Sequence, residues 1–189
     1  NNLFRNEKFI FLTVGRLVAV KNIGMQIEAM AEIINNRQPT TDNRQLELWI
    51  VGAGPEKENL QLKIKKLKLQ NFIKILGWQN DLKKYYSKTD AFLLTSDSEG
   101  GGLVAIEAAS YGLPIIMTDV GCAGEVIKNE ASGLVIPVGD KNKLVEAMAK
   151  IMENKELRER LGMNARKATE ELPAKEEVLT LYKESWDKA

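Results

Sequence analysis

The chain has 189 residues and a nearly balanced charge, with 27 Lys and Arg against 26 Asp and Glu. This length fits one domain or one lobe of a larger protein, and the balanced charge excludes the strongly basic composition expected of a dedicated nucleic-acid-binding protein. A single cysteine excludes an intrachain disulfide framework and fits a cytoplasmic protein, and the absence of histidine removes the commonest metal ligand and the usual general base.

The chain begins with two units in which a short apolar run precedes a helical pattern. FIFLTVG at 9–15 predicts the first strand, because it is apolar, rich in β-forming residues and ended by glycine. The apolar residues that follow recur at helical spacings of 4, 3 and 4: Ile23, Ile27, Met30 and Ile34. LELWIVG at 46–52 repeats the strand, and the segment 55–67 opens with proline and acidic residues, as a helix does.

The rest of the chain adds four strand candidates and a helical C-terminal part. The four further apolar runs are 72–77, 91–96, 114–118 and 133–138. Because parallel neighbouring strands need long return connections, six strands separated by helical segments predict a Rossmann-like domain of three α/β/α layers with a six-stranded parallel sheet. Asp140 can cap a helix, so we expect C-terminal helices at 141–154 and 155–171 and a last one after Pro173.

In such a sheet, ligands bind at the carboxyl ends of the strands, so the loops that follow the strands are the candidate sites. After the first strand, Arg16 and Lys21 lie five residues apart on a loop that leads into a helix. The planar guanidinium of arginine and the mobile ammonium of lysine, beside a helix N-terminus, suit a diphosphate. The alternative is a pair of solvated surface cations, in a chain with many basic residues.

The loops after the second and third strands carry weaker signals. Gly52-x-Gly54 opens a helix as in a dinucleotide-binding motif, but the third glycine of that motif would fall at Lys57, and the loop belongs to the second strand unit. We therefore expect these glycines to serve a tight turn and close helix packing. Trp78, after the third strand, is placed either to stack on a base or to cover the edge of the sheet.

The loop after the fourth strand is the most informative segment, SEGGGLVAIEAASYGLPII at 98–116. The glycines 100–102 precede a helical pattern, so the first amides of that helix have no intrahelical partner and a phosphate can approach them closely. Glu107, about one turn into the helix, can accept hydrogen bonds from both hydroxyls of a ribose. Glu99 can reach hydroxyls on the group that the phosphate carries. The alternative is a glycine-rich bend with two surface glutamates.

This segment resembles the E-x7-E segment of retaining GT-B-fold glycosyltransferases of the group 1 type (family 4), which typically begins E-G-F/G-G-L/M and ends in glutamate and alanine. Three more motifs of that family have counterparts in the same order: VGRL with KN at 14–22, TDVGCAGEVI at 118–127 and SGLVIPVGD at 132–140. The resemblance runs from about residue 8 to residue 150. Gly101 stands where the family often has phenylalanine, so one hydrophobic wall is missing here.

The resemblance implies one half of a GT-B fold, the domain that binds the nucleotide-sugar donor in an enzyme that transfers the sugar with retention, without a cofactor or a required metal. Arg16 and Lys21 would hold the diphosphate and stabilise the leaving nucleotide, Glu99 would bind sugar hydroxyls, and Glu107 the ribose. Arg16, Lys21 and Glu99 are the expected catalytic residues. The implied donor-binding set is Gly15, Arg16, Lys21, Gly77, Trp78, Glu99, Gly100, Gly101, Gly102, Leu103, Val104 and Glu107.

The resemblance also implies an acceptor-binding N-terminal domain, and since the chain starts at Asn1 and not with methionine, we expect a piece of a longer protein. Residues 1–173 would form the donor domain, and 174–189 a helix whose Tyr182 and Trp186 pack on the other domain. We expect a UDP-sugar donor, with GDP- and ADP-sugars as alternatives, a glycan or lipid-linked acceptor, and no nucleic-acid partner. The whole enzyme would be cytoplasmic and able to associate with the inner face of the membrane.

Two other functions stay open. A GT-B nucleotide-sugar epimerase would need catalytic histidines, and this chain has none. A nucleotide-binding module without catalysis is the second, and the clustered charged residues of the candidate site argue against it. The basic run KIKKLK at 63–68 is either a solvated helix face or a face for anionic lipid. We interpret Cys122 as a small residue and not a nucleophile, because no partner base is apparent.

Overall fold

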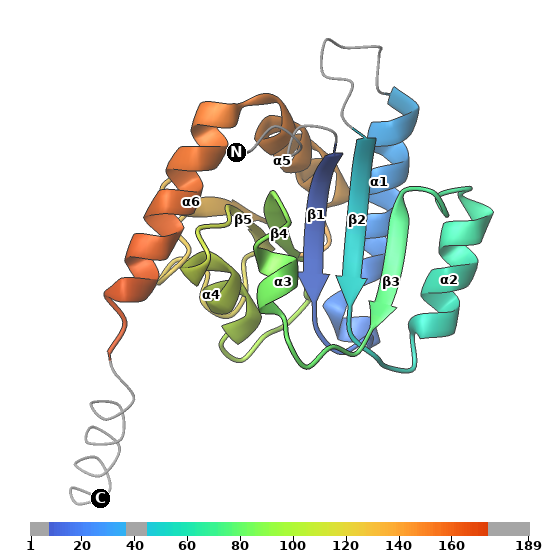
Figure 1. Ribbon diagram of the computed structural model, residues 1–189, viewed down its shortest axis with the longest axis horizontal. Helices are drawn as coiled ribbons and strands as arrows, with labels where there is room; N and C mark the ends of the chain where they lie inside the picture. The colour runs from blue at the N-terminus through green and yellow to red at the C-terminus, as the bar shows by residue number, and fades with distance from the viewer. Residues whose placement is uncertain (1–7, 37–44, 174–189) are drawn as a thin grey trace, which may run out of the picture.

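The computed structural model describes residues 8–36 and 45–173 (Figure 1), so the helix expected at 174–189 lies outside the described residues. The described strands are β1 (Lys8–Val14), β2 (Gln45–Val51), β3 (Ile73–Gly77), β4 (Ala91–Leu94), β5 (Ile115–Thr118) and β6 (Gly133–Ile136). The described helices are α1 (Ile23–Asn36), α2 (Lys57–Lys66), α3 (Lys83–Tyr86), α4 (Leu103–Ser110), α5 (Lys141–Glu153) and α6 (Lys155–Glu170). A short 3-10 turn, η1 (Ala19–Lys21), precedes α1.

The described strands form one parallel sheet in the order β3-β2-β1-β4-β5-β6. β1 pairs with β2 along its whole length, from Lys8 opposite Gln45 to Val14 opposite Val51, whereas it is paired with β4 only at two central positions. This order confirms the predicted Rossmann-like sheet. It also places the reversal of winding direction between β1 and β4.

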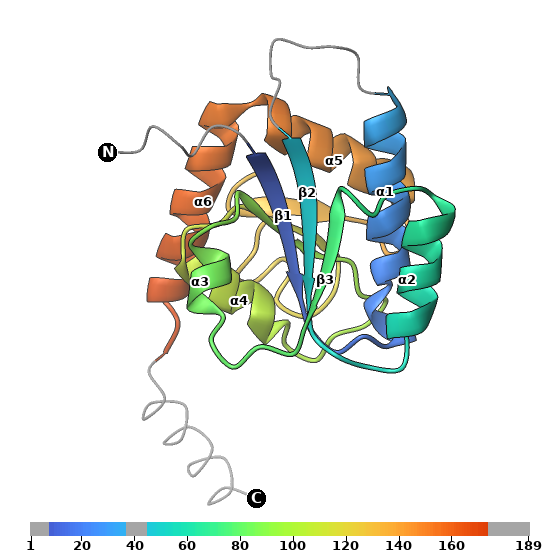
Figure 2. The same ribbon diagram turned by 45° about the vertical axis from the view of Figure 1, so that its right-hand side comes forward.

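Helices cover both faces of the sheet (Figures 1 and 2). α1, α2 and α5 lie on one face and share a core with Phe9 and Phe11 of β1, whereas Tyr86 of α3 and Ala108 of α4 pack with Leu12 on the other face. α6 runs beside α4. Because β1 is buried on both faces, its sequence is a nearly continuous apolar run. Among the described helices, none has the length and hydropathy needed to cross a bilayer.

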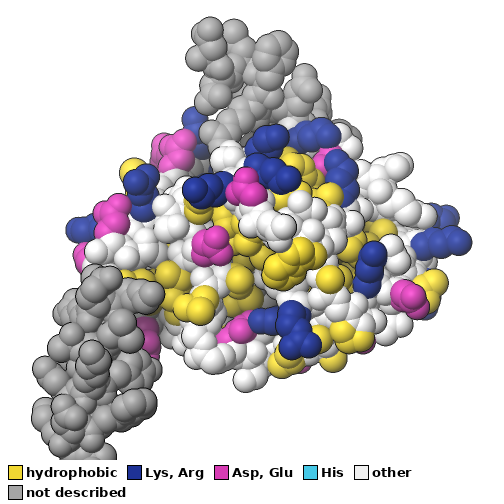
Figure 3. Space-filling model, turned by 60° about the horizontal axis from the view of Figure 1, so that its bottom comes forward, with side chains coloured by type: hydrophobic (Ala, Val, Ile, Leu, Met, Phe, Trp, Pro, Cys, Tyr) yellow, Lys and Arg dark blue, Asp and Glu magenta, His cyan; other side chains and the backbone are white. Residues whose placement is uncertain are grey.

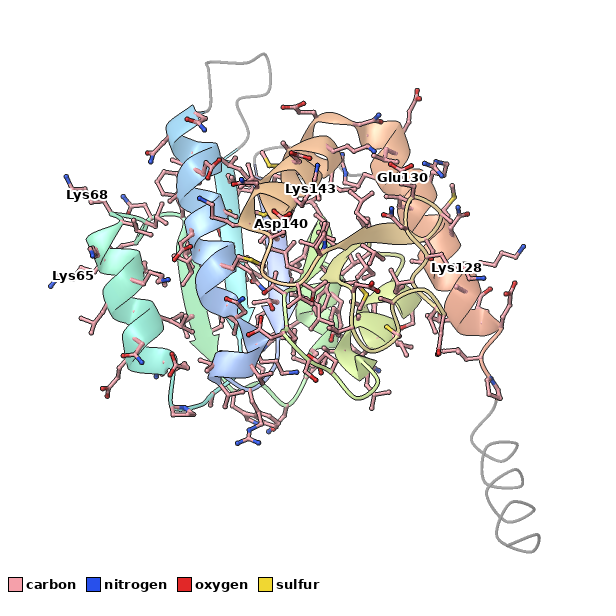
Figure 4. All side chains as sticks on the ribbon, turned by 180° about the vertical axis from the view of Figure 1, so that it is seen from behind. Lys65, Lys68, Lys128, Glu130, Asp140 and Lys143 are labelled. Carbon is pink, nitrogen blue, oxygen red and sulfur yellow. The ribbon has the colours of Figure 1, made fainter. Side chains whose placement is uncertain are left out.

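Side-chain caps begin the two C-terminal helices. Asp140 Oδ1 accepts a hydrogen bond from the backbone N–H of Lys143 at 2.9 Å at the start of α5, where Figure 4 labels both residues. Asn154 Oδ1 accepts one from the backbone N–H of Leu157 at 2.8 Å at the start of α6. Each cap satisfies an amide that has no partner inside the helix. The cap predicted at Asp140 is therefore confirmed.

The observed elements differ from the predicted ones mainly at their ends. The strand predicted at 91–96 ends at Leu94, because Thr95 and Ser96 direct their hydroxyls to loop residues at the edge of the sheet. The second helix starts two residues later than predicted, at Lys57. The short helix α3 had no distinct sequence pattern. These differences leave the strand order and the position of each loop unchanged.

Candidate functional site

The loops after β1 and β4 meet where the sheet reverses its winding. The chain leaves β1 toward β2 and leaves β4 toward β5, on opposite sides, so the carboxyl ends of these neighbouring strands border a crevice. The backbone N–H of Asp97 donates to the Val20 carbonyl at 2.8 Å, and Asn22 Nδ2 donates to Asp97 Oδ1 at 3.0 Å. These bonds hold the two loops together. Figure 3 turns this edge of the sheet toward the viewer and shows basic and hydrophobic side chains on it.

An ion pair bridges the crevice. Lys21 Nζ, on the β1 side, lies 2.5 Å from Glu99 Oε1, on the β4 side. The hydroxyl of the buried Ser96 donates to the same oxygen at 2.5 Å. The two charged side chains remain 21% and 11% exposed, and within residues 8–36 and 45–173 no donor reaches Glu99 Oε2. The pair thus presents an unoccupied carboxylate oxygen and an ammonium group that can bind a second partner.

Helix α4 begins directly after the three glycines. Gly102 is its N-cap residue, lies in the left-handed region with φ of 62°, and has no side chain that could cap the helix. The amides of Leu103 and Val104, in the first turn, therefore have no intrahelical acceptor. A Cβ atom on Gly100 or Gly101 would meet nothing within 4 Å, so both face open space. The predicted helix start is confirmed, and anion binding at its amides stays a prediction.

The loop after β5 packs against the glycine loop. A Cβ atom on Gly121 would lie 3.0 Å from Glu99 Cβ and 3.0 Å from the Gly102 nitrogen, so a larger residue would displace both. Cys122 is buried, with Sγ 4.0 Å from the Gly102 carbonyl oxygen, and burial raises the pKa of its thiol. This agrees with Cys122 as a small packing residue. The sequence places Gly121 in the TDVGCAGEVI loop, but its close approach to Glu99 and Gly102 depends on how the two loops pack.

Glu107 lies on the exposed side of α4 and has a buried partner. The hydroxyl of Tyr86, the last residue of α3, donates to Glu107 Oε2 at 3.2 Å. The Tyr86 ring is 1% exposed and stacks on Tyr111, with ring centroids 5.0 Å apart. Burial raises the pKa of Tyr86, and the charge of Glu107 raises it further, so the hydroxyl remains a donor. Sequence reasoning missed Tyr86, which looks like an ordinary aromatic residue of a short helix.

Gly15 and Arg16 follow β1 at the same edge. The backbone N–H of Gly15 donates to the Val51 carbonyl at 3.0 Å, and a Cβ atom on Gly52 would lie 1.8 Å from the Gly15 carbonyl oxygen. The Gly52-x-Gly54 turn therefore serves close packing against the loop after β1, whereas close helix packing was expected. Arg16 is exposed and, among the residues that the structure describes, has no ion-pair partner. Its guanidinium is available to a ligand at this edge.

Gly77 and Trp78 lie apart from the ion pair. They follow β3, the outer strand, at three strand spacings or roughly 14 Å from the β4 loop. Trp78 is 72% exposed, and its indole N–H donates to Asn80 Oδ1 at 2.9 Å. The structure brings Lys21 and Glu99 into contact but leaves Trp78 at the far end of the same edge.

The candidate site lies along the carboxyl edge of the sheet, and one described hollow borders it. A hollow of about 210 Å³ between α1 and α2 is also lined by Val18, Ala19 and Asn22, which flank Lys21 in the loop after β1. A second hollow, of about 400 Å³, lies beside α6, and neither hollow is lined by the glycine loop or its two glutamates. Exposed apolar side chains follow the strands at this edge: Val20, Trp78, Leu103 and Val138. We call these four side chains the apolar fringe of the edge.

Curated relatives resemble this chain over most of its length. It is 28% identical over 173 residues to N-acetyl-alpha-D-glucosaminyl L-malate synthase of Bacillus anthracis. The aligned region covers 92% of this chain and 44% of that protein. It is 32% identical over 155 residues to UDP-Gal:alpha-D-GlcNAc-diphosphoundecaprenol alpha-1,3-galactosyltransferase of Escherichia coli, covering 81% of this chain and 39% of that protein. The chain thus spans less than half the length of these relatives.

A solved structure and a family model complete the comparison. Sucrose-phosphate synthase from Thermosynechococcus elongatus superposes with a TM-score of 0.82 and 29% identity, covering 100% of this chain and 48% of that chain. The three-layer architecture is that of GT-B glycosyltransferase structures. The family described as glycosyl transferases group 1 matches residues 1–168. The sheet order, the motifs and this match together establish that the chain belongs to the group 1 family of glycosyl transferases.

Proposed function

We propose that this chain is the donor-binding half of a glycosyltransferase that moves a sugar from a nucleotide sugar to an acceptor and retains the anomeric configuration. The observation that carries the proposal is the Lys21–Glu99 ion pair, which joins a cation and a carboxylate across the crevice beside the start of α4. A nucleotide sugar needs a cation for its diphosphate and a carboxylate for its hydroxyl groups.

In the proposed reaction, the bond between the anomeric carbon and the diphosphate breaks, and negative charge develops on the leaving nucleotide. Arg16 and Lys21 stabilise this charge together with the unpaired amides at the start of α4. The lysine ammonium carries three N–H donors, so it can keep its bond to Glu99 while it binds a phosphate oxygen. The acceptor hydroxyl then forms the new bond to the anomeric carbon on the face that the diphosphate leaves, and its proton passes to an oxygen of the departing diphosphate.

The two glutamates bind different parts of the donor. Glu99 accepts hydrogen bonds from sugar hydroxyls through its unoccupied Oε2, and Glu107 accepts them from the ribose. The glycines of the loop allow the donor to approach the main chain closely. Gly77 and Trp78 bind the base, whose planar ring can stack on an exposed indole.

The second half of the enzyme closes the site. The apolar fringe at the carboxyl edge supports a covering domain, and the relatives are more than twice as long as the matched region. We propose that this domain binds the acceptor and that residues 174–189, outside the described part, pack on it. The domain division at residue 173 stays a prediction.

We propose UDP as the nucleotide and a lipid-linked or glycan acceptor. The Escherichia coli relative is named for UDP-Gal and for an acceptor on diphosphoundecaprenol. An acceptor of this kind would bring the whole enzyme to the inner face of a membrane as a peripheral, cytoplasmic protein. On this chain, Lys65 and Lys68 project outward from the region of α2 (Figure 4), where they are free to contact anionic lipid headgroups.

Calorimetric titration of the 189-residue chain with UDP, GDP and ADP tests the proposal. We expect UDP to bind, and the double substitution Lys21→Ala with Glu107→Ala to weaken binding roughly 100-fold, because it removes two charged hydrogen-bonding groups. Lys150→Ala is the matched control, since Lys150 pairs with Glu130 on the surface at 2.9 Å. Absence of binding by all three nucleotides, or equal binding by the double variant, would contradict the proposal.

Sugar transfer requires the longer protein that contains this chain. There, we expect Glu99→Gln to lower kcat/KM for the nucleotide sugar while the affinity for free UDP stays within about twofold, because Glu99 binds the sugar and not the nucleotide. Product analysis by NMR would report the anomeric configuration. An inverted product would overturn retention and leave nucleotide binding intact.

A further inference from the structure

In the part of the chain that the structure describes, the hydroxyl of the buried Tyr86 bonds to one partner, on the helix α4 that follows the glycine loop. That partner is Glu107 Oε2, at 3.2 Å. We propose that Tyr86 is a positioning residue that holds the Glu107 carboxylate in the orientation that binds the ribose hydroxyls of the donor. This proposal rests on the proposed function, since it concerns the same nucleotide site.

Packing fixes the position of the Tyr86 hydroxyl. The ring is 1% exposed, stacks on Tyr111 at an interplanar angle of 25°, and lies 6.2 Å from the Phe92 ring of β4. The backbone N–H of Tyr86 donates to the Leu82 carbonyl at 3.1 Å, which anchors the short helix α3. With the ring held on both sides, the hydroxyl has one fixed place beside α4.

Glu107 needs such an anchor. It is exposed on α4, and in the described part of the chain Tyr86 is the side chain that bonds its carboxylate. A free glutamate side chain samples several rotamers, and a ligand that binds it must stop this motion at a cost in affinity. A hydrogen bond to one oxygen reduces that cost and leaves further acceptor sites on both oxygens for a diol.

A substitution can distinguish two possible roles of this buried tyrosine. A residue that only fills the core acts through its ring, and the ring is kept in Tyr86→Phe. A residue that orients Glu107 acts through its hydroxyl, so removal of the hydroxyl should weaken only those ligands that Glu107 contacts. Tyr85→Phe is the matched control, because Tyr85 precedes Tyr86 on α3 and packs edge-on against Trp49 at 6.1 Å.

The test measures the affinity of UDP and of 2′,3′-dideoxyuridine diphosphate for the wild-type chain and the two variants by calorimetry. We expect Tyr86→Phe to bind UDP about fivefold more weakly, which is the usual effect of one lost hydrogen bond. The dideoxy compound lacks the ribose diol, so it should bind the wild-type chain and Tyr86→Phe equally. Tyr85→Phe should bind both ligands as the wild-type chain does.

A double-mutant cycle provides the second measurement. In a Glu107→Ala background, Tyr86→Phe should have no further effect on UDP affinity, because the group that it positions is gone. Cooperative thermal unfolding of each variant checks that the fold is kept. Tyr86→Phe that binds UDP like the wild-type chain, or that weakens both ligands by the same factor, overturns the positioning role alone. A wild-type chain that binds no nucleotide overturns the proposed function instead.

Discussion

Two lysine–glutamate clusters in this chain differ in what they leave for a ligand. In the first, Glu47 on β2 is 1% exposed and accepts hydrogen bonds from Lys8 at 2.6 Å, Lys74 at 2.8 Å and the Trp49 indole at 2.7 Å. Both of its oxygens are occupied. In the second, Glu99 is 11% exposed, and its two donors share one oxygen. Two carboxylates with similar cationic partners thus have different capacities for a further bond.

The difference shows how a structural carboxylate is told from a binding one. Burial by itself raises the pKa of Glu47, but the bonds from Lys74, Lys8 and Trp49 outweigh burial and lower the pKa to about 2. The cluster joins three neighbouring strands close to their amino ends, at the edge of the sheet opposite the candidate site. Glu99 stands at the carboxyl edge beside unpaired amides, where a ligand can reach it. Saturation and position therefore favour a stabilising role for the first cluster and fit the proposed donor-binding role of the second.

The largest effect should come from Glu47→Ala. This change removes the buried carboxylate that accepts hydrogen bonds from Lys8, Lys74 and the Trp49 indole, and loss of these three bonds costs roughly 3 kcal/mol of unfolding free energy, since both lysines are nearly half exposed and can be solvated. Urea denaturation would measure it. UDP affinity should stay unchanged where the variant is folded, and a parallel loss of affinity would break the distinction between the two clusters.

Acid should act on the same cluster with a similar magnitude. Because the pKa of Glu47 falls from its ordinary value of 4.5 to about 2 in the folded state, its stabilisation is present above pH 4.5 and is lost as the pH falls toward 2. The shift corresponds to about 3 kcal/mol. Glu47→Gln lacks this group, so its stability should fall less over that range. If the unfolding curves of the wild-type chain and of Glu47→Gln shifted equally with pH, the assignment of this pH dependence to Glu47 would be contradicted.

Lys21→Ala should have the opposite profile. We expect UDP affinity to fall about 30-fold, or about 2 kcal/mol, because a charged hydrogen bond to the diphosphate is lost. The unfolding free energy should change by about 1 kcal/mol, less than for Glu47→Ala, because Glu99 keeps its bond from Ser96 and both side chains of the pair remain in part open to solvent. Calorimetry and urea denaturation on the same sample measure both quantities. A variant that loses stability but keeps its affinity would make this cluster structural too.

The smallest effect should come from the loop beneath Glu99. Gly121 has φ of 58°, and an alanine there would crowd Glu99 and Gly102. We expect Gly121→Ala to cost about 1 kcal/mol in unfolding free energy and to weaken binding of a UDP-sugar more than binding of UDP. Gly112→Ala is the control, because Gly112 also has a left-handed φ, of 75°, but a Cβ atom there would come no closer than 4.0 Å to a neighbour, the Gly162 carbonyl oxygen. Equal behaviour of the two variants would show that the loop at Gly121 does not position Glu99.

Local patterns explain which parts could be predicted from the sequence. Strands and helices follow from the spacing of apolar residues along a short segment, so all six strands were located to within two residues of their observed ends. The glycine loop before α4 was also predicted from a local pattern, three consecutive glycines in front of a helical segment. The individual site roles remain predictions, although the structure brings Lys21 and Glu99 into contact.

The residues that support the site could not be predicted in this way. Ser96, Gly121 and Tyr86 each act on a residue that another loop or helix brings to them. A serine after a strand, a glycine in a loop and a tyrosine in a short helix are common in any α/β domain. Their contacts depend on how neighbouring loops pack, which no local pattern records.

By itself, the sequence determined the element types, the parallel sheet and the family, because apolar periodicity and motif spacing act over short stretches of chain. The tertiary structure decided which carboxylate is saturated and which is open. β1 lies beside β4, so Lys21 meets Glu99 across 78 residues of chain, while Glu47 lies between two strands that each supply a lysine. Strand order sets these neighbours, and it results from the packing of the whole domain.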